Sequence, residues 1–402
     1  MIDSFHFKNY RIFRTEQELR IRPITIVFGK NNTGKSAILK LPIIVENILG
    51  NNSKEVVSDV FGDGPTLFTE LRDIVYGKAT KAIELGCFNK EYRASINCSF
   101  FVDTTQKPST RIEKFSISNG EVSHYFQWDV DNYYHIDDAK KTVSLNFDGI
   151  IPIQNNLTPF ISETINKLRF KTDYIGSIRI FPQIDMRLQT TIPIASGFSG
   201  QHTYQMLISD ALGDGLLAEK VSKWYADNFA GWHLMVDKSR QPVFHIELEK
   251  NGLRTNITET GMGIVQSLPI VIRACTPCLI PTLIILEEPE THLHSAAHAS
   301  LGELIAMSTK EDPNKYYLIE THSKNFILRL RRLIANKQLE IDDVALYYVD
   351  FDEQKSSSSL HEIHIDKDGS VDFWPKQMFD ESLQETIAIR TIQLKQTNDS
   401  RD

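Results

Sequence analysis

Three short apolar runs in the chain each stop at polar residues, and we expect each to be a strand of one sheet. They are Ile24–Phe28, Leu283–Leu286 and Tyr316–Ile319. Apolar runs of about four to eight residues, bounded by turn residues, are typical of strands that are covered on both faces, as in parallel sheets. The pattern therefore predicts an α/β protein whose mixed, mainly parallel sheet is flanked by helices.

A different pattern fills the middle of the chain. From about residue 87 to residue 154, polar and apolar positions alternate between turn residues, which predicts antiparallel strands. Residues 158–229 hold two helical patterns on either side of an expected strand at 174–181. Near the C-terminus, "DDVALYYVDF" and "LHEIHID" predict two strands joined by a loop that contains Ser356–Ser359.

The first apolar run leads into a stretch with the spacing Gly-x-x-x-x-Gly-Lys-Ser, followed by the start of an apolar helix. This strand–loop–helix context is typical of a phosphate-binding P-loop. Glycines let successive backbone N–H groups face an anion, and the helix N-terminus adds partial positive charge. We expect the Lys35 ammonium to reach the outer phosphates and the Ser36 hydroxyl to bind Mg²⁺. The expected nucleotide-binding residues are Gly29, Lys30, Asn31, Asn32, Thr33, Gly34, Lys35, Ser36 and Ala37.

Two consecutive carboxylates, Glu287 and Glu288, follow the second apolar run, with Glu290 close behind. Adjacent carboxylates repel and are costly to bury, so such a pair is found mainly where a cation or a proton transfer needs it. We expect their strand to lie beside the P-loop strand, with both acids in the crevice at the carboxyl edge of the sheet. Glu287 would then hold the water shell of Mg²⁺, and Glu288 would take a proton from the water that attacks the γ-phosphate.

Two further elements complete the expected site. The third apolar run ends in Glu320-Thr321-His322-Ser323, which places His322 where it can sense or stabilise a γ-phosphate. Between the P-loop and the acids, Gly261 and Gly263 open an apolar helix. The start of that helix is a second N-terminus suited to phosphate.

Composition narrows the class of protein. The chain has 402 residues, 41% of them hydrophobic, which is enough for a large core and a second lobe. Its formal net charge of −8 argues against a generally basic nucleic-acid binder. Because there are only four cysteines, no secretory leader pattern and no uninterrupted apolar span, we expect a soluble cytoplasmic protein without a disulfide framework.

Several smaller groups of residues have both a functional and a structural interpretation, and for most of them the sequence favours the structural one. They are the C-x-x-C at Cys275 and Cys278, the basic run Leu328–Leu333, Trp374-Pro375, and His292, His294 and His298. The functional alternatives are a metal or redox pair, a nucleic-acid contact, a partner-binding tip and metal ligands, respectively. Tyr10 and Phe13 are open between base stacking and core packing.

In this order, the P-loop, the glycine-led helix, the strand with two glutamates and the strand with a histidine resemble an ABC-type ATPase. The resemblance is most specific to the OLD-like branch of prokaryotic ABC ATPases, through "EEPETHLH", "THS" and "GMGIVQSLP". The stretches "FHFKNYRIF" and "DYIGSIRIFP" also look like that branch. The chain departs from the wider ABC pattern where Glu287 replaces Asp at the Mg²⁺ position, and its signature lacks the Leu-Ser-Gly-Gly form.

The resemblance implies an ATPase that binds ATP and Mg²⁺ and closes head to tail around ATP as a homodimer or higher oligomer. Glu288 would be the catalytic base, His322 the switch histidine and Lys35 a phosphate ligand. Ser36 and Glu287 would hold Mg²⁺. The helix opened by the two glycines would contact the ATP held by the second subunit.

The expected organisation is a split ATPase core with two inserted parts. Residues 1–86 would form the N-terminal half with the P-loop, 87–172 a β-rich lobe, 173–256 a helical insertion and 257–402 the C-terminal half.

The same resemblance bears on the partner. OLD-type nucleases carry a TOPRIM nuclease domain after the ATPase, whereas the 80 residues after His322 read as a strand hairpin and a helix. We therefore expect a sensor or regulator of a separate effector, a nuclease or toxin, in bacterial antiphage defence. The alternative is a RecF-like repair or recombination ATPase that binds DNA directly, and a contact with DNA or RNA stays open. No membrane partner is expected.

Overall fold

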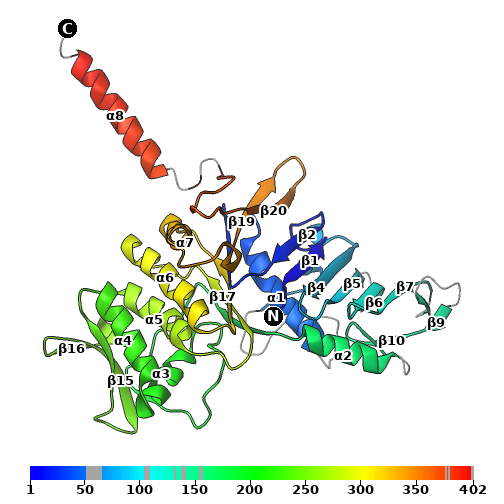
Figure 1. Ribbon diagram of the computed structural model, residues 1–402, viewed down its shortest axis with the longest axis horizontal. Helices are drawn as coiled ribbons and strands as arrows, with labels where there is room; N and C mark the ends of the chain where they lie inside the picture. Colours follow the sequence, from blue (N-terminus) through cyan, green and yellow to red (C-terminus); the bar gives the residue numbers. More distant parts are fainter. Residues whose placement is uncertain are drawn as a thin grey trace.

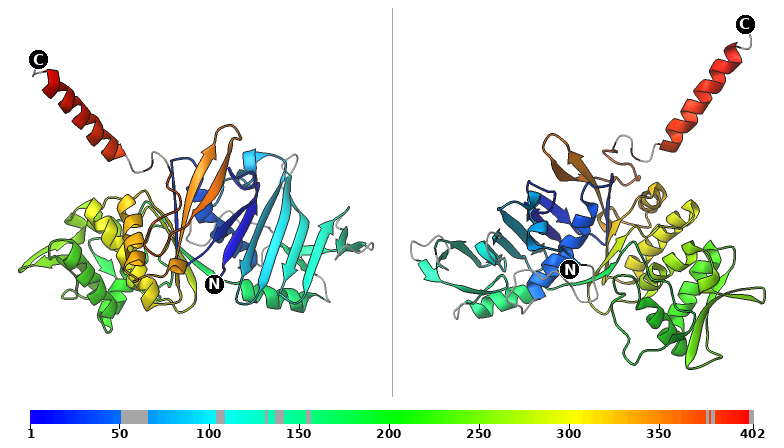
Figure 2. Two further views of the ribbon diagram at one scale, coloured as in Figure 1. Left: turned by 45° about the horizontal axis from the view of Figure 1, so that its top comes forward. Right: turned by 180° about the vertical axis from the view of Figure 1, so that it is seen from behind.

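The computed structural model describes residues 1–50, 66–103, 109–130, 133–136, 142–153, 157–375, 378 and 381–399. Two large sheets, two smaller ones and a group of helices make up the described body, and the last helix, α8 (Glu381–Asp399), extends away from it (Figures 1 and 2). In the described part of the chain, no helix is both long enough and apolar enough to cross a membrane.

The central sheet has six strands in the order β12-β17-β18-β3-β19-β20. Neighbouring strands are parallel except β20, which is antiparallel to β19. The strands are β12 (Lys171–Ile175), β17 (Thr282–Glu287), β18 (Lys315–Glu320), β3 (Ile24–Gly29), β19 (Val344–Asp352) and β20 (Ser357–Ile363). The predicted fold class is confirmed in its architecture: a mixed, mainly parallel α/β core with flanking helices, an antiparallel β-rich lobe and a helical insertion.

Both faces of the central sheet are buried because alternate residues of each strand enter different hydrophobic cores. In β17, Leu283 and Ile285 join the core that contains helix α1 (Lys35–Gly50), whereas Ile284 and Leu286 join the opposite core. The opposite core contains α5 (Met262–Cys275), α6 (Ser295–Glu311) and α7 (Lys324–Ala335). This two-sided burial explains why the strands appear in the sequence as unbroken apolar runs.

An eight-stranded antiparallel sheet lies beyond α1 and shares its core, in the order β2-β1-β4-β5-β6-β7-β8-β9 (Figure 1). Its strands are β2 (Gln17–Arg20), β1 (Ser4–Lys8), β4 (Ala82–Asn89), β5 (Ala94–Asp103), β6 (Ser109–Ser118), β7 (Ser123–Trp128), β8 (Tyr133–Ile136) and β9 (Thr142–Ser144). Next to it lie the short pair β10 (Asn146–Asp148) and β11 (Ile151–Ile153) and helix α2 (Thr158–Leu168). Tyr10 and Phe13 are fully buried in this shared core, so the core interpretation holds for both.

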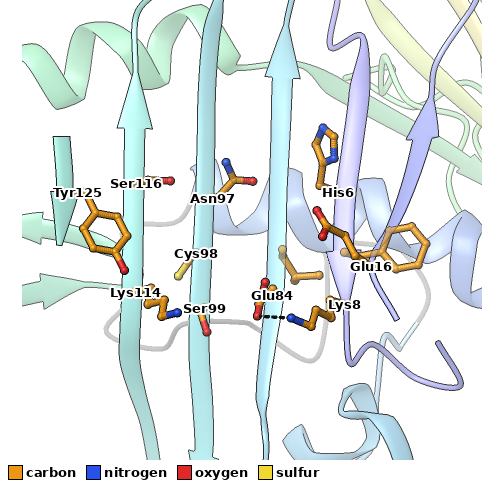
Figure 3. Close-up of a pocket in the computed structure, with 12 residues that line it drawn as sticks. His6, Lys8, Glu16, Glu84, Asn97, Cys98, Ser99, Lys114, Ser116 and Tyr125 are labelled. Carbon is orange, nitrogen blue, oxygen red and sulfur yellow. Dashed lines mark hydrogen bonds and ion pairs between the residues drawn. The ribbon is translucent and has the colours of Figure 1, made fainter. Parts of the chain in front are cut away.

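A polar groove of about 400 Å³ crosses this sheet (Figure 3). Its lining includes His6, Lys8, Glu84, Asn97 and Tyr125, and none of the expected nucleotide-binding residues lines it. Lys8 Nζ donates to Glu84 Oε1 at 3.2 Å, so its charge is already partly compensated.

The helical insertion packs against α5. It contains α3 (Thr203–Leu212), α4 (Leu216–Asn228) and a small antiparallel sheet. The strands of that sheet are β13 (Met186–Arg187), β14 (His233–Asp237), β15 (Val243–Lys250) and β16 (Leu253–Asn256). Short 3₁₀ helices complete the chain: η1 (Leu71–Ile74), η2 (Tyr76–Lys78), η3 (Ile257–Glu259) and η4 (Ile341–Asp343).

The expectation that the strand with the paired acids lies beside the P-loop strand is wrong. Strand β18 pairs with β17 on one side and with β3 on the other. Because β18 is the strand that ends in Glu320, a carboxylate and His322 come between the paired acids and the P-loop. Two smaller expectations also change: the strand expected at 174–181 ends at Ile175, and Ser357–Ser359 lie in β20 rather than in the loop before it.

The division into segments 1–86, 87–172, 173–256 and 257–402 stays a prediction, and residues 51–65 of its first segment lie outside the described residues. Two of its boundaries fall inside strands, because β4 spans Ala82–Asn89 and β12 spans Lys171–Ile175. The eight-stranded sheet thus takes β1 and β2 from the first segment.

A buried ion pair fixes β12 to α5, and its removal should be costly. Arg273 Nε lies 2.5 Å from Asp173 Oδ2, and both side chains are almost fully buried. Breaking one side of a buried pair leaves an uncompensated charge, so Asp173→Asn should lower the free energy of unfolding by about 3–5 kcal/mol in urea titrations. As the matched control, Asp342→Asn removes an exposed partner of Arg22 and should change stability little. Equal effects of the two substitutions would contradict this account.

Candidate nucleotide site

The P-loop leaves the end of β3 and turns directly into α1. Glycine is required at two positions of the loop, because other atoms lie too close for a Cβ atom to fit. A Cβ on Gly29 would lie 2.5 Å from the carbonyl oxygen of Val349, and a Cβ on Gly34, whose φ is +102°, would lie 2.8 Å from the Ile12 side chain. Thr33 Oγ1 donates to Lys30 O at 2.9 Å and closes the turn. The loop therefore has the tight form that aims backbone N–H groups at an anion.

The Lys35 ammonium, at the start of α1, is buried and held from two sides. Its Nζ donates to Lys30 O at 2.9 Å and lies 3.5 Å from Glu320 Oε1. Ser36 Oγ donates to the other oxygen of the same carboxylate, at 3.1 Å. The two P-loop side chains with the most specific expected roles thus converge on a residue that ends a neighbouring strand.

Glu320 has an unusual protonation equilibrium. Burial raises the pKa of this carboxyl to about 7, and the nearby Glu287 and Glu288 act in the same direction. Lys35 and the hydrogen bond from Ser36 lower the pKa, but they do not outweigh burial. At neutral pH the Glu320 carboxyl is therefore close to its pKa, although it lies beside the Lys35 ammonium.

The paired acids lie on the next strand of the sheet. Glu287 is the register partner of Glu320, and its Oε1 accepts a hydrogen bond from the Tyr174 hydroxyl. The next residue, Glu288, has a φ of +41°, and its backbone N–H donates to Glu320 O at 2.9 Å. Thr291 Oγ1 donates to Glu288 Oε2 at 3.1 Å. The positive φ bends the chain away from the strand line at the point where the two carboxylates follow one another.

His322 lies next to Glu288, with its Nε2 3.8 Å from Glu288 Oε1. Burial lowers the pKa of His322, and the Lys35 charge lowers it further. Glu290 holds the backbone at this point, because its Oε1 accepts from the His322 N–H and from Thr321 Oγ1, both at 2.7 Å. The second oxygen of Glu290 is buried without a hydrogen-bond partner.

Arg179 fixes the backbone of the two consecutive glutamates, Glu287 and Glu288. This side chain is 2% exposed, and its Nη2 donates to the carbonyl oxygens of Glu287 and Glu288, at 2.7 and 2.9 Å. Burial lowers its pKa to about 10, against the opposing effect of the three nearby glutamates. Gln266 on α5 exchanges hydrogen bonds with the Arg179 backbone, at 3.0 and 3.3 Å. A continuous set of contacts thus joins the glycine-led helix to the acids.

The two signature-like glycines have different surroundings. Gly261 is the N-cap of α5 and is exposed, with no side-chain capping hydrogen bond at the helix start. A Cβ on Gly263 would lie 2.6 Å from the carbonyl oxygen of His292 in the same chain, so this glycine allows close packing. Neither glycine forms part of the cluster around Lys35, and their expected contact with the ATP of a second subunit stays a prediction.

The arrangement fits a phosphate-bearing ligand and a divalent cation. One ligand atom each from Glu288, Glu320 and His322 lies within 4.8 Å of the other two. Ser36 and Glu287, the expected Mg²⁺ ligands, both lie at this edge of the sheet, although Ser36 contacts Glu320 and Glu287 contacts Tyr174. Oxygen ligands of this kind are those that Mg²⁺ prefers.

Sequence reasoning gave no role to four side chains that shape the site: Tyr174, Arg179, Glu290 and Glu320. The signal for Glu320 was present, since it ends a buried strand as Glu287 does. Tyr174 and Arg179 lie in a stretch that draws attention only through family resemblance, and their contacts bridge more than 100 residues of chain. The residues next to Tyr174 and Arg179 in the sequence do not predict these contacts.

The smaller groups have structural contacts in the described chain. His294 caps α6, and the His298 ring contacts Ser323 Oγ and Leu293 O, at 2.9 and 3.0 Å. Cys278 accepts a contact from Arg273 at 3.1 Å in the turn from α5 to β17. Trp374 stacks on Phe28, with ring centroids 5.6 Å apart. In the basic run on α7, Arg329 pairs with Glu303.

Comparison with known proteins gives little beyond the fold. A family described as a protein of unknown function (DUF3696) matches residues 339–388, which cover β19, β20 and the first part of α8. No curated protein matches the chain.

Among solved structures, the SMC head domain from Thermotoga maritima has a TM-score of 0.46 and 10% identity, covering 90% of this chain and 99% of that one. An Smc head bound to the C-winged helix domain of ScpA has a TM-score of 0.46 and 11% identity, covering 91% and 98%. An Smc head with an extended coiled coil, bound to a ScpA domain derived from Pyrococcus furiosus, has a TM-score of 0.40 and 11% identity, covering 97% and 99%. These likenesses are too distant to assign a function.

The raised pKa of Glu320 predicts a pH-dependent stability. Since its folded pKa of about 7 is above the ordinary value of 4.5, the protonated form is favoured in the folded state. The contribution is fully present below about pH 4.5 and is lost as the pH rises through 7. The melting temperature of Glu320→Gln minus that of the wild type should therefore rise between pH 5 and pH 7.5, measured by thermal denaturation without nucleotide. Parallel pH profiles for the two proteins would show that Glu320 titrates normally.

Proposed function

We propose that this chain is an ATPase that binds Mg-ATP at the P-loop edge of the central sheet and hydrolyses it to ADP and phosphate. The observation that carries the proposal is the convergence of Lys35 and Ser36 on Glu320, with Glu288 and His322 beside them. These residues come from two strand ends, those of β17 and β18, and from the start of α1, and they meet where parallel sheets bind ligands.

Each side chain has a role that its surroundings support. Lys35 exchanges its contact with Glu320 for the outer phosphates, and the loss of this counter-charge favours the protonated form of the Glu320 carboxyl. Ser36 and Glu287 would hold Mg²⁺, which would neutralise part of the phosphate charge when bound. Glu288 takes a proton from the attacking water. Burial lowers the pKa of His322, which favours the neutral ring, and this ring can donate one N–H to a phosphate oxygen.

The proposal includes closure of two copies head to tail around ATP. It is supported by the exposed start of α5, where Gly261 leaves the first helical N–H groups without a side-chain cap, and where Met262 is 43% exposed. Such a helix start attracts phosphate. The chain from α5 through Gln266 and Arg179 to the acids offers a route by which a contact at the helix start can reach the catalytic edge.

For the biological role, we propose an OLD-like regulator of a separate effector, a nuclease or toxin, in bacterial antiphage defence, acting in the cytoplasm. The support is the sequence resemblance through "EEPETHLH", "THS" and "GMGIVQSLP". Direct binding of DNA, as in a RecF-like repair ATPase, is the competing outcome that the second experiment below distinguishes.

Replacing the proposed base should separate binding from hydrolysis. Glu288→Gln should keep Mg-ATP binding and lower the hydrolysis rate by about 10² to 10⁴, as expected for loss of a general base. Phosphate release and nucleotide titration measure the two quantities. The matched control is Glu311→Gln, at the end of α6. Glu311 is exposed and pairs with Lys220, so this variant should hydrolyse ATP at the wild-type rate. Turnover near wild type in Glu288→Gln would exclude Glu288 as the base.

The same trapped variant tests the partner. Glu288→Gln, expressed with its neighbouring genes and purified by affinity in Mg-ATP, should give a complex with a second polypeptide on native mass determination. A homodimer that instead retains DNA, with salt-dependent binding, would support the DNA-repair alternative. A monomer in Mg-ATP would contradict the proposed closure of two copies.

A further inference from the structure

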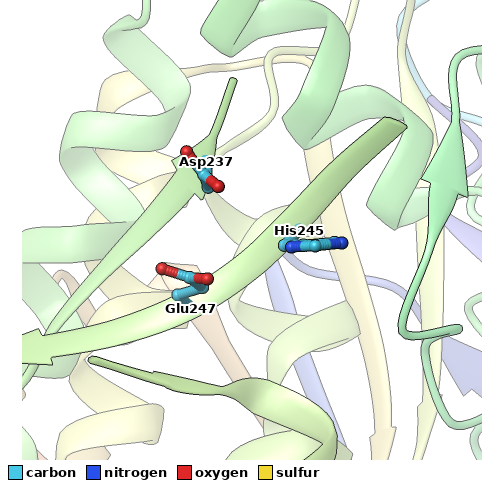
Figure 4. Close-up of side chains that lie close together, drawn as sticks. All are labelled: Asp237, His245 and Glu247. Carbon is cyan, nitrogen blue, oxygen red and sulfur yellow. The ribbon is translucent and has the colours of Figure 1, made fainter. Parts of the chain in front are cut away.

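A second group of metal-ligating side chains lies on the small sheet of the insertion, separate from the P-loop edge (Figure 4). Asp237 ends β14, and His245 and Glu247 lie on β15. Asp237 and His245 are register partners across the antiparallel pair, and Glu247 is two residues further along the strand. Because side chains alternate between the faces of a strand, all three lie on one face.

The ligand atoms of these residues are close enough to share one cation. One atom each from Asp237, His245 and Glu247 lies within 4.8 Å of the other two. Metal–ligand bonds of about 2.0–2.3 Å place the ligands of one ion at separations within this range.

His245 is set up as a metal ligand by its second nitrogen. The side chain is only 9% exposed, and Nε2 lies 2.8 Å from Asp185 Oδ1. An N–H donated from Nε2 to this carboxylate leaves Nδ1 as the unprotonated acceptor, and within the described part of the chain Nδ1 has no hydrogen-bond partner. In Figure 4 one ring nitrogen lies on the side of the two carboxylates, and the other points away from them. Histidines that bind metals typically donate their other N–H to a carboxylate in this way.

The carboxylates lack a close counter-charge. Glu247 Oε2 is buried without a hydrogen-bond partner, and Arg254 Nη1 lies 4.0 Å from this oxygen. Asp237 is held by the Ser239 N–H at 3.1 Å and by its hydroxyl at 2.9 Å, and these hydrogen bonds lower the pKa of Asp237. Two carboxylates and one imidazole nitrogen therefore lie close together at a place where a cation would compensate the negative charge.

We propose that Asp237, His245 and Glu247 bind a divalent transition-metal cation, with Asp185 orienting the histidine. One imidazole and two carboxylates suit Zn²⁺ better than Mg²⁺ or Ca²⁺, which prefer oxygen ligands only. The bound cation ties the β14–β15 hairpin to the segment that precedes β13, where Asp185 lies. Its role is to stabilise the insertion, and it is independent of ATP hydrolysis.

The competing account is a protonated His245 paired with Asp185 and Asp237, which needs no metal. The two accounts differ in their response to Zn²⁺ and Co²⁺. The full-length protein, stripped with a chelator, is titrated with Zn²⁺ by calorimetry and with Co²⁺ by visible absorption. His233→Ala, which removes an exposed histidine at the start of β14, is the matched control. His322→Ala removes the only histidine of the other described metal-ligating group, at the P-loop edge.

The proposal expects a Zn²⁺ site that persists in His233→Ala and His322→Ala and weakens at least 100-fold in His245→Ala. Asp185→Asn, at an exposed residue outside the ligand set, should weaken Zn²⁺ binding by about 10- to 100-fold. If His245→Ala does not fold, Asp237→Asn takes its place with the same expected loss. The proposal is overturned if His245→Ala or Asp237→Asn binds both ions like the wild type, or if the wild type binds Zn²⁺ only at millimolar concentration.

Discussion

A buried lysine at the start of α1 needs a counter-charge, and the rest of the site is arranged around the one that β18 supplies. Lys35 and Ser36 both contact the Glu320 carboxylate, which is itself largely removed from water. Charges in such a place are tolerated only when they are paired and hydrogen-bonded. The order β17-β18-β3 satisfies this requirement, because it puts the end of β18 between the P-loop and the paired acids.

That arrangement leaves the edge of the sheet with more negative charge than the lysine can balance. Glu287, Glu288 and Glu320 follow one another across two adjacent strand ends. Burial raises the pKa of Glu320, and the neighbouring Glu287 and Glu288 carboxylates raise it further. An Mg²⁺ ion bound together with a nucleotide would reduce the repulsion among these carboxylates. The surplus of negative charge at this edge of the sheet is therefore complementary to the cation of the proposed ligand.

The two hydrophobic cores attach different parts of the chain to the central sheet. The core around α1 joins the central sheet to the eight-stranded sheet, and the core around α5–α7 joins it to the insertion. Arg179 and Gln266 cross from the insertion side to the backbone of the acids. The small sheet of the insertion, with its own His245 cluster, lies at the outer end of this second core.

The sequence by itself determined the central strands, the P-loop and the residues that end the strands, because these depend on local patterns: apolar runs buried on both faces and glycines at fixed spacing. It did not determine the order of the strands, since periodicity is the same for a strand in any position of a parallel sheet. Only the tertiary structure decided that β18 separates β17 from β3. It also decided the partners of Lys35, Tyr174, Arg179 and Glu290, because those contacts join residues far apart in the chain, where burial and charge compensation choose the partner.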